Sequence, residues 1–243
     1  MRTQKIWNLV SMINLILTLM VIVSLMSPEP GLTNFKTALS TYSPLVIKNG
    51  NGQAVAVASG VRISRKFILS CSHIAEGKNG KQVFFDGEKL KIVARDKIND
   101  LILLKVNAVG DDFPLVRISL KAKAGTEAFD CSNAGVNSGT LNYYLITNSD
   151  GKRICLDKPV IPGESGAGLF DGGGNLVGIC SGAMMLNYKN DPVHFASYGF
   201  ANGPIVILEF LSTVKDPDFN GCRDLLPVQT WLDRIVSRFY MKN

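Results

Sequence analysis

Gly163-Glu164-Ser165-Gly166-Ala167-Gly168, followed directly by Leu169-Phe170, is the stretch on which the fold assignment of this 243-residue chain rests. A serine between glycines has free space on both sides, and glycine backbone adopts angles that other residues avoid. This arrangement suits a nucleophile, because it exposes the serine Oγ and can turn backbone N–H groups toward a developing oxyanion. The same pattern also occurs in glycine-rich hairpin corners. The interpretation therefore depends on whether the chain supplies a base and a carboxylate to orient it.

A histidine and an aspartate stand beside strongly apolar, strand-like runs. His73, one of only two histidines, follows the run Phe67–Ser72, and Asp100 directly precedes the run Leu101–Val106. With Ser165 they occur in the order histidine, aspartate, serine, which is the order of one known class of Ser-His-Asp triad.

Asp96 is the alternative for the carboxylate. It lies in Arg95-Asp96-Lys97, where a solvated surface charge is expected, and it does not directly precede an apolar strand. We therefore assign the orienting role to Asp100.

These segments resemble the chymotrypsin-like (trypsin/HtrA-type) serine protease superfamily. Its patterns are a strand ending T/S-A-A-H, a D-I-A-L-L-K-V strand, and G-D/N-S-G-G-P-L-F followed by a turn and G-x-L-V-G-I. A fourth pattern is a strand with the sequence G-F-A, found late in HtrA-like domains. The matching segments, in order, are Leu69–His73, Asp100–Val106, Gly163–Phe170 with Leu176–Ile179, and Tyr198–Ala201. The resemblance covers roughly residues 42–240 and predicts a serine-type endopeptidase, a hydrolase.

The resemblance implies a mechanism through an acyl-enzyme intermediate. Ser165 Oγ would attack the scissile carbonyl, His73 would take and return the proton, and Asp100 would hold the histidine tautomer. The backbone N–H groups of Gly163 and Ser165 would form the oxyanion hole, and each donor would stabilise the transition state by about 3–4 kcal/mol. The mechanism requires no metal and no organic cofactor, and the five cysteines show no spacing typical of a zinc site.

The resemblance also places the substrate-binding residues. The floor of the primary specificity pocket would lie around Pro159 and Val160, and Pro159 occupies the place of the carboxylate that selects basic side chains in trypsin. Ser181-Gly182-Ala183 aligns with the strand that pairs with the substrate backbone. Because these residues are small, we expect an apolar or small side chain before the scissile bond. His194 could instead reach the pocket and favour an acidic or amide side chain, although a simple loop histidine fits its position after Asp191-Pro192.

The sequence departs from the family pattern beside the nucleophile. Ala167 stands where a second glycine is usual, Gly168 where proline is usual, and Glu164 takes the usual Asp/Asn position in a role that the sequence leaves open. None of these changes removes the base or a backbone donor. The chain also has no Ile-Val-Gly-Gly start after a basic residue, which argues against trypsin-style activation of a precursor.

Short β-type runs separated by turn residues predict an all-β fold of two six-stranded antiparallel barrels. The first barrel would span about residues 42–120, with a last strand at 115–119, and the second about 125–212, with a last strand at 205–210. The active site would lie in the cleft between them. Apolar residues at helical spacing after Pro227 predict a C-terminal helix over about 227–240, so the protease domain would cover residues 42–243.

The N-terminus predicts export. Residues 1–5 carry two positive charges, and 6–26 form an uncharged apolar run of 21 residues that would span about 30 Å as a helix. We interpret 1–30 as a single-pass signal anchor and 31–41 as a polar tether. Cleavage of a signal peptide near Ser24 or Ser27, giving a secreted protein, is the alternative. In both cases the protease domain would lie on the extracytoplasmic side.

Composition limits the partners and the rival functions. The net charge of +6 is scattered without a Lys/Arg block, so the expected partners are a polypeptide substrate and the membrane, and not nucleic acid. A catalytically weak pseudoprotease that binds peptides is the alternative function. An α/β-hydrolase esterase using Ser165, Asp191 and His194 would need glycine at Ala167 and a parallel βαβ pattern, which we do not find.

Overall fold

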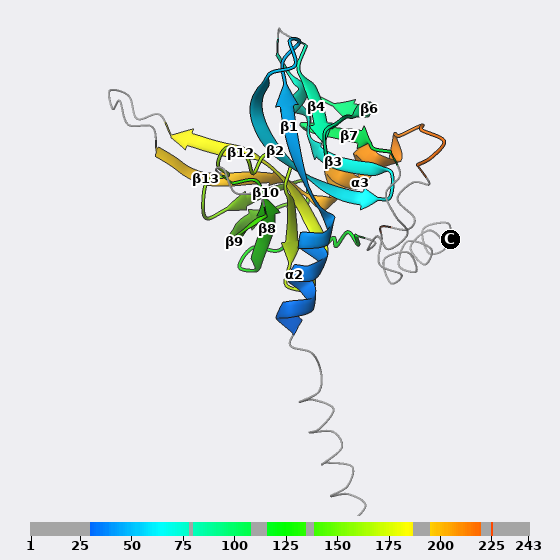
Figure 1. Cartoon of the computed structure of the whole chain (residues 1–243). Coiled ribbons are helices and arrows are strands. Elements are labelled where there is room, and N and C mark those ends of the chain that lie inside the picture. The colour runs from blue at the N-terminus through cyan, green and yellow to red at the C-terminus, as the bar shows by residue number, and fades with distance from the viewer. Residues whose placement is uncertain are drawn as a thin grey trace, which may run out of the picture.

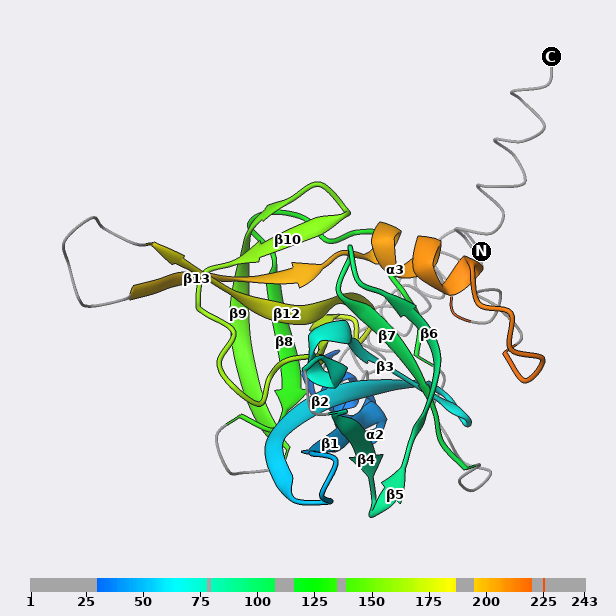
Figure 2. The same cartoon turned by 90° about the horizontal axis from the view of Figure 1, so that it is seen from above.

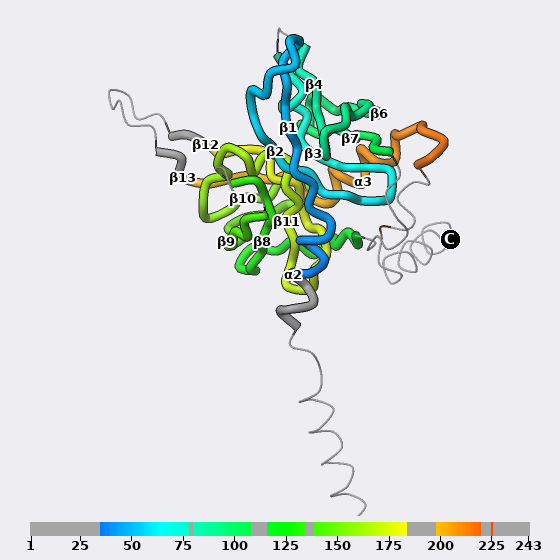
Figure 3. Tube along the Cα trace, in the orientation of Figure 1, coloured from blue at the N-terminus to red at the C-terminus, as the bar shows by residue number. Residues whose placement is uncertain are grey.

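Two antiparallel β-sheets make up most of the structure, a computed structural model (Figure 1). The first sheet is built from the N-terminal half of the chain and the second from the C-terminal half. The chain forms the strands of the first sheet, then those of the second, and afterwards returns to lie beside the first sheet (Figure 3). The residues that the structure describes are 30–77, 80–107, 116–134, 139–186, 195–219 and 225.

The first sheet has seven strands in the spatial order β5-β4-β1-β2-β3-β7-β6. Its strands are β1 (Tyr42–Lys48), β2 (Ala54–Ser64), β3 (Phe67–Cys71), β4 (Gln82–Phe85), β5 (Glu88–Lys89), β6 (Lys91–Asp96) and β7 (Leu101–Lys105). The expected closed six-stranded barrel is therefore wrong for this half, because β5 and β6 are the two edges of the sheet as described. The edge strand β5 has only two residues, both charged and exposed, and is too short to close the sheet onto β6.

The second sheet is a closed barrel of six strands in the order β10-β13-β12-β11-β8-β9, which confirms the barrel predicted for this half. Its strands are β8 (Glu127–Ser132), β9 (Thr140–Ser149), β10 (Arg153–Leu156), β11 (Gly168–Asp171), β12 (Leu176–Leu186) and β13 (Phe195–Asn202). The two halves lie side by side when the molecule is viewed from above (Figure 2).

The apolar runs reflect burial on both faces of the first sheet. In β7 the four residues Leu101 to Leu104 are all buried. Leu101 and Leu103 join the core shared with the barrel, whereas Ile102 and Leu104 join a second cluster on the other face of the first sheet. Because successive side chains of a strand point to opposite faces, a strand covered on both sides carries continuous apolar sequence.

The prediction of two strands, at residues 205–210 and 115–119, is wrong. Residues 205–210 belong to helix α3 (Pro204–Ser212), which follows the extended residue Gly203. A short buried apolar run is compatible with a strand or with a helix. Pro204 favours the helix, because proline lacks an N–H group and the N–H groups of the first helical turn have no partner within the helix. In the described part of the expected strand 115–119, only Ile118 forms a β-bridge, to Leu176.

Residues 31–41, expected to form a tether, lie in helix α2 (Pro30–Thr41). Ala38 is buried in the shared core, and the Phe35 ring lies 4.8 Å from that of Phe129. In the described part of the chain no helix is long and apolar enough to cross a membrane. The expected spanning segment 6–26 and the expected C-terminal helix 227–240 both lie outside the described residues.

Candidate active site

A single turn of 3-10 helix, η1 (Ser72–Ala75), carries His73 at the end of β3. Arg95 on β6 fixes this turn, since its Nε donates to Ser72 Oγ at 2.7 Å and its Nη2 donates to the Ser72 carbonyl at 2.9 Å. The Ser72 N–H donates to the carbonyl of Asp100 at 3.1 Å. The backbone that carries His73 is therefore held from two neighbouring elements.

Asp100 adopts a left-handed conformation, with φ of 53°, immediately before β7. Its Oδ1 accepts the backbone N–H of His73 and its Oδ2 faces the ring Nδ1, both at 2.8 Å. Ser181 also donates its hydroxyl to Oδ2. Burial opposes ionisation of Asp100, but the hydrogen bonds from His73 and Ser181 outweigh it and hold the pKa below its usual value. The site thus contains an ionised carboxylate that fixes both the backbone and the ring of His73.

Asp96 is engaged in its own turn. Its carboxylate accepts the backbone N–H groups of Ile98 and Asn99 at 2.9 and 3.0 Å and the side-chain amide of Asn99 at 2.6 Å. In the structure it is therefore Asp100, and not Asp96, that is hydrogen-bonded to His73.

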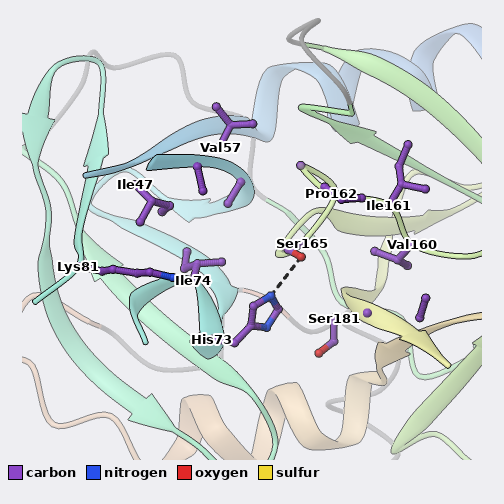
Figure 4. A pocket seen from close by; sticks show the side chains of 15 residues that line it. Ile47, Val57, His73, Ile74, Lys81, Val160, Ile161, Pro162, Ser165 and Ser181 are labelled. Atoms are coloured by element: carbon purple, nitrogen blue, oxygen red, sulfur yellow. Dashed lines mark hydrogen bonds between the residues drawn. The ribbon is translucent and has the colours of Figure 1, made fainter. Parts of the chain in front are cut away.

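Ser165 lies opposite His73 on the turn between β10 and β11, with its Oγ 3.1 Å from the ring Nε2 (Figure 4). Gly166 permits this turn, because its φ is 85° and a Cβ at this position would collide with Ser70 Oγ and the Ser59 carbonyl. The structure thus brings together the three residues that the sequence singled out, in the order Asp100, His73, Ser165.

Ser59 on β2 ties the first sheet to the nucleophile turn. Its Oγ donates to the Gly163 carbonyl at 2.7 Å and accepts the Asn133 N–H at 2.9 Å, and its N–H donates to the Ser165 carbonyl at 2.9 Å. Sequence reasoning missed this role, because the partners Asn133 and Gly163 lie 74 and 104 residues away along the chain. The only signal was the place of Ser59 in the strand before the histidine strand.

The nucleophile turn, Gly163–Gly166, has two backbone N–H groups with hydrogen-bond partners and two without a partner among the described residues. The N–H of Glu164 donates to the Ile161 carbonyl and that of Gly166 to the Cys180 carbonyl, at 3.1 and 2.7 Å. The N–H groups of Gly163 and Ser165, by contrast, have no hydrogen-bond partner within the described segments. These are the two donors that the sequence proposed for an oxyanion hole.

A groove of about 470 Å³ opens over Ser165 and His73 (Figure 4). Its remaining lining comes from both halves of the molecule: Ile47, Ala56, Val57, Ala58, Ile74 and Lys81 from the first, and Val160, Ile161, Pro162, Gly163, Ser181, Gly182 and Ala183 from the second. Four of the five predicted substrate-binding residues therefore line the groove. Pro159 is the exception and lies half-buried outside the lining.

Glu164 belongs to a buried acidic cluster behind the nucleophile turn, a role that the sequence left open. Its Oε2 accepts the Ile161 N–H at 2.7 Å, and the hydroxyl of the nearby Tyr144 donates to Asp130 Oδ2 at 3.3 Å. Burial and, to a smaller extent, the neighbouring charge of Glu164 together raise the pKa of Asp130 to about 7, against the hydrogen bond from Asn142. Burial also raises the pKa of Glu164. A proton is therefore retained in this cluster near neutral pH.

We expect Asp130→Asn to remove a pH dependence of stability. The pKa of Asp130 rises from 3.8 to about 7 on folding, so the folded state holds the proton more tightly and stability falls as pH rises toward 7. From pH 5 to 8 this loss amounts to about 2–3 kcal/mol in the wild type. Urea unfolding at the two pH values measures it. The exposed turn residue Asp150, whose pKa is lowered, provides the control, since Asp150→Asn should keep the wild-type difference between pH 5 and 8. An unchanged difference in Asp130→Asn would contradict the assignment.

One group of side chains in the described segments has metal-ligand geometry, namely Cys71, His73 and Asp100. The Cys71 Sγ lies 3.7 Å from His73 Nε2, but burial holds the pKa of this thiol well above its usual value. His73 and Asp100 bond to one another at 2.8 Å. In the described segments Cys71, Cys131, Cys155 and Cys180 are free thiols.

Two β-sheets that meet at an aspartate, a histidine and a serine define the chymotrypsin-like class of fold. Residues 58–179 match the trypsin-like peptidase domain family, which is half of the chain, and the chain belongs to this family. The resemblance found in the sequence is thereby confirmed.

Among curated proteins, a probable periplasmic serine endoprotease DegP-like of Marinomonas sp. is 32% identical over 145 residues. Protein y4bJ of Sinorhizobium fredii is 26% identical over 156 residues. The matched regions cover 54% and 60% of this chain but only 30% and 24% of these two relatives. The similarity is thus to one part of longer proteins.

Solved structures agree on the fold. A serine endoprotease from Yersinia pestis superposes with a TM-score of 0.58 at 19% identity, covering 75% of this chain and 65% of that one. The HtrA-type protease AlgW with a tripeptide superposes with a TM-score of 0.57 at 21% identity, covering 75% of this chain and 62% of that one.

Proposed function

We propose that the protein is a serine endopeptidase that hydrolyses peptide bonds through His73, Asp100 and Ser165. The observation that carries this proposal is the hydrogen-bonded series from Asp100 through His73 Nδ1 and Nε2 to the Ser165 hydroxyl, with spacings of 2.8 and 3.1 Å. A base that touches the nucleophile and is itself oriented by a carboxylate is the arrangement that nucleophilic catalysis by serine requires. Membership of a peptidase family supports the same chemistry.

The mechanism follows from these contacts. Ser165 Oγ attacks the scissile carbonyl while His73 Nε2 takes its proton, and Asp100 stabilises the imidazolium. The free N–H groups of Gly163 and Ser165 stabilise the oxyanion. The C–N bond then breaks, His73 gives its proton to the leaving amine, and the acyl group stays on Ser165. Water, deprotonated by His73, attacks this ester. The bond between the acyl carbon and Ser165 Oγ then breaks, His73 returns the proton to Oγ, and the acid is released.

The substrate lies along an open strand edge. β12 pairs with β11 only as far as Ile179, whereas its pairing with β13 continues beyond. The segment Ser181–Ala183 therefore has a free backbone edge inside the groove, to which an extended peptide adds as a further strand. That AlgW, of the same fold, was solved with a tripeptide supports this binding mode. The small residues Gly182 and Ala183 leave room for an apolar or small side chain beside Val160.

We also place the domain outside the cytoplasm, tethered by residues 6–26 or secreted after cleavage. The positive residues 1–5 before an uncharged run support this topology. The Marinomonas relative is described as periplasmic, which is consistent with it. The N-terminal sequence of the mature protein decides between the alternatives: an intact Met1 is expected for an anchor, and a start near residue 25 or 28 would show cleavage.

Labelling by a fluorophosphonate tests the function directly. The reagent phosphonylates a serine whose oxygen is activated by a base, so we expect it to label the full chain at Ser165. Mass spectrometry locates the label, and digestion of a peptide library by the same preparation reports hydrolysis and side-chain preference. A folded protein that neither takes the label nor cleaves peptides would favour the peptide-binding pseudoprotease.

A further inference from the structure

Lys81 is the one lysine that lines the groove, and no carboxylate lines it among the residues that the structure describes. Apart from His73, the other lining residues are apolar, small or uncharged. Lys81 lies directly before β4, half-buried, and its side chain points toward Ile74 in Figure 4. The proposed mechanism gives this cation no part.

Lys81 lies on the leaving-group side of the site. In Figure 4 Lys81 and Ile74 lie on one side of Ser165, and Val160 and Ile161 lie on the other. The free edge at Ser181–Ala183 takes the residues before the scissile bond. Because His73 protonates the leaving amine, the residues after the bond must run past His73 toward Ile74 and Lys81.

The ammonium of Lys81 is available to a substrate. Within the described part of the chain it makes no ion pair and no hydrogen bond, unlike Arg95 on β6, which pairs with Glu76 at 3.3 Å. Its aliphatic stem passes over Gly77, where an added Cβ would lie 3.1 Å from Lys81 Cε. The stem is thus supported while the charge faces a groove with apolar walls, where water screens a charge less than on an open surface.

We propose that Lys81 selects substrates with Asp or Glu at the first or second position after the scissile bond. The inference rests on the proposed peptidase function and names its substrate class: polypeptides with an apolar or small residue before the cleaved bond and an acidic residue after it. Because the ion pair is partly exposed, we expect a preference of about three- to fivefold in kcat/KM for glutamate over glutamine. The preference should shrink as salt rises.

The test uses two pairs of peptides with one cleavage site, identical except for Glu or Gln at the first or the second position after it. In the full-length wild type at low salt, at least one pair should show a preference of about three- to fivefold for the Glu peptide. In Lys81→Met the ratio of kcat/KM for the Glu and Gln peptides should fall to about one, and in Lys81→Glu it should fall below one. Lys91→Met, at an exposed lysine of β6 that does not line the groove, should retain the wild-type ratio.

The outcomes separate this proposal from the function on which it rests. A wild-type ratio near one for both pairs, or a preference that survives in Lys81→Met, overturns the role of Lys81 and leaves the peptidase function standing. Failure to cleave either member of each pair, together with failure of fluorophosphonate to label Ser165, overturns the peptidase function itself.

Discussion

His73→Ala is expected to lower kcat for peptide hydrolysis by about 10⁶-fold. The ring Nε2 lies 3.1 Å from Ser165 Oγ, and the Ser165 hydroxyl donates no other hydrogen bond within the described residues. Without the ring, the serine remains a neutral alcohol and the leaving amine has no proton donor. Residual turnover would come from the oxyanion donors and from substrate binding. Steady-state kinetics on one peptide, with circular dichroism to verify folding, measures the effect.

The second histidine provides the matched control. His194→Ala should retain substantial turnover, because no step of the mechanism uses this residue. The opposite pattern, with activity lost in His194→Ala and kept in His73→Ala, would favour the esterase alternative built on Ser165, Asp191 and His194. Asp191 and His194 lie outside the described residues, so kinetics decides this point.

Asp100→Asn should lower turnover by about 10⁴-fold, equivalent to about 5.5 kcal/mol of activation barrier. Oδ2 now faces the Nδ1–H of His73 and accepts the hydroxyl of Ser181. An amide nitrogen at this position would favour the tautomer that carries its proton on Nε2, and that nitrogen could no longer accept the proton of Ser165. Asparagine tolerates the left-handed backbone of residue 100, so the fold should persist.

Asp96→Asn is the control that separates an orienting role from a structural one. Its carboxylate caps its own turn through Ile98 and Asn99, and loss of such a cap costs about 1 kcal/mol of stability. Turnover should change by less than about tenfold. Both variants are compared at one pH with their melting temperatures. Near-normal turnover in well-folded Asp100→Asn, or a collapse in Asp96→Asn, would show that the carboxylate is misassigned.

The sequence by itself identified the family and the candidate triad, because each part is a local signal. A serine between glycines, a histidine at the end of an apolar run and an aspartate before another are readable within a few residues. Their order along the chain then points to one fold. The strands of the closed barrel were predictable for the same reason, since short alternating or apolar runs between turn residues define strands locally.

Local signals were insufficient where two structures fit the same run. Residues 205–210 form part of α3, and their apolar character suits a buried helix as well as a strand. Closure of the first sheet depends on whether its edge strands can pair, and the short, charged β5 offers only two residues for this. The hydrophobic periodicity of the sequence does not predict whether two edge strands pair with one another.

Only the tertiary structure decided which distant residues support the site. Ser181 reaches Asp100 across 81 residues of sequence, and Ser59 bonds to the Gly163 carbonyl across 104. Lys81 enters the groove because β4 pairs with β1 beside the histidine turn. These contacts arise because the two sheets pack together and bury a shared core. Such packing joins strands that are far apart along the chain, so no local sequence pattern predicts it. The chemistry was therefore readable from short motifs, while the hydrogen bonds and charges that orient it arise from packing.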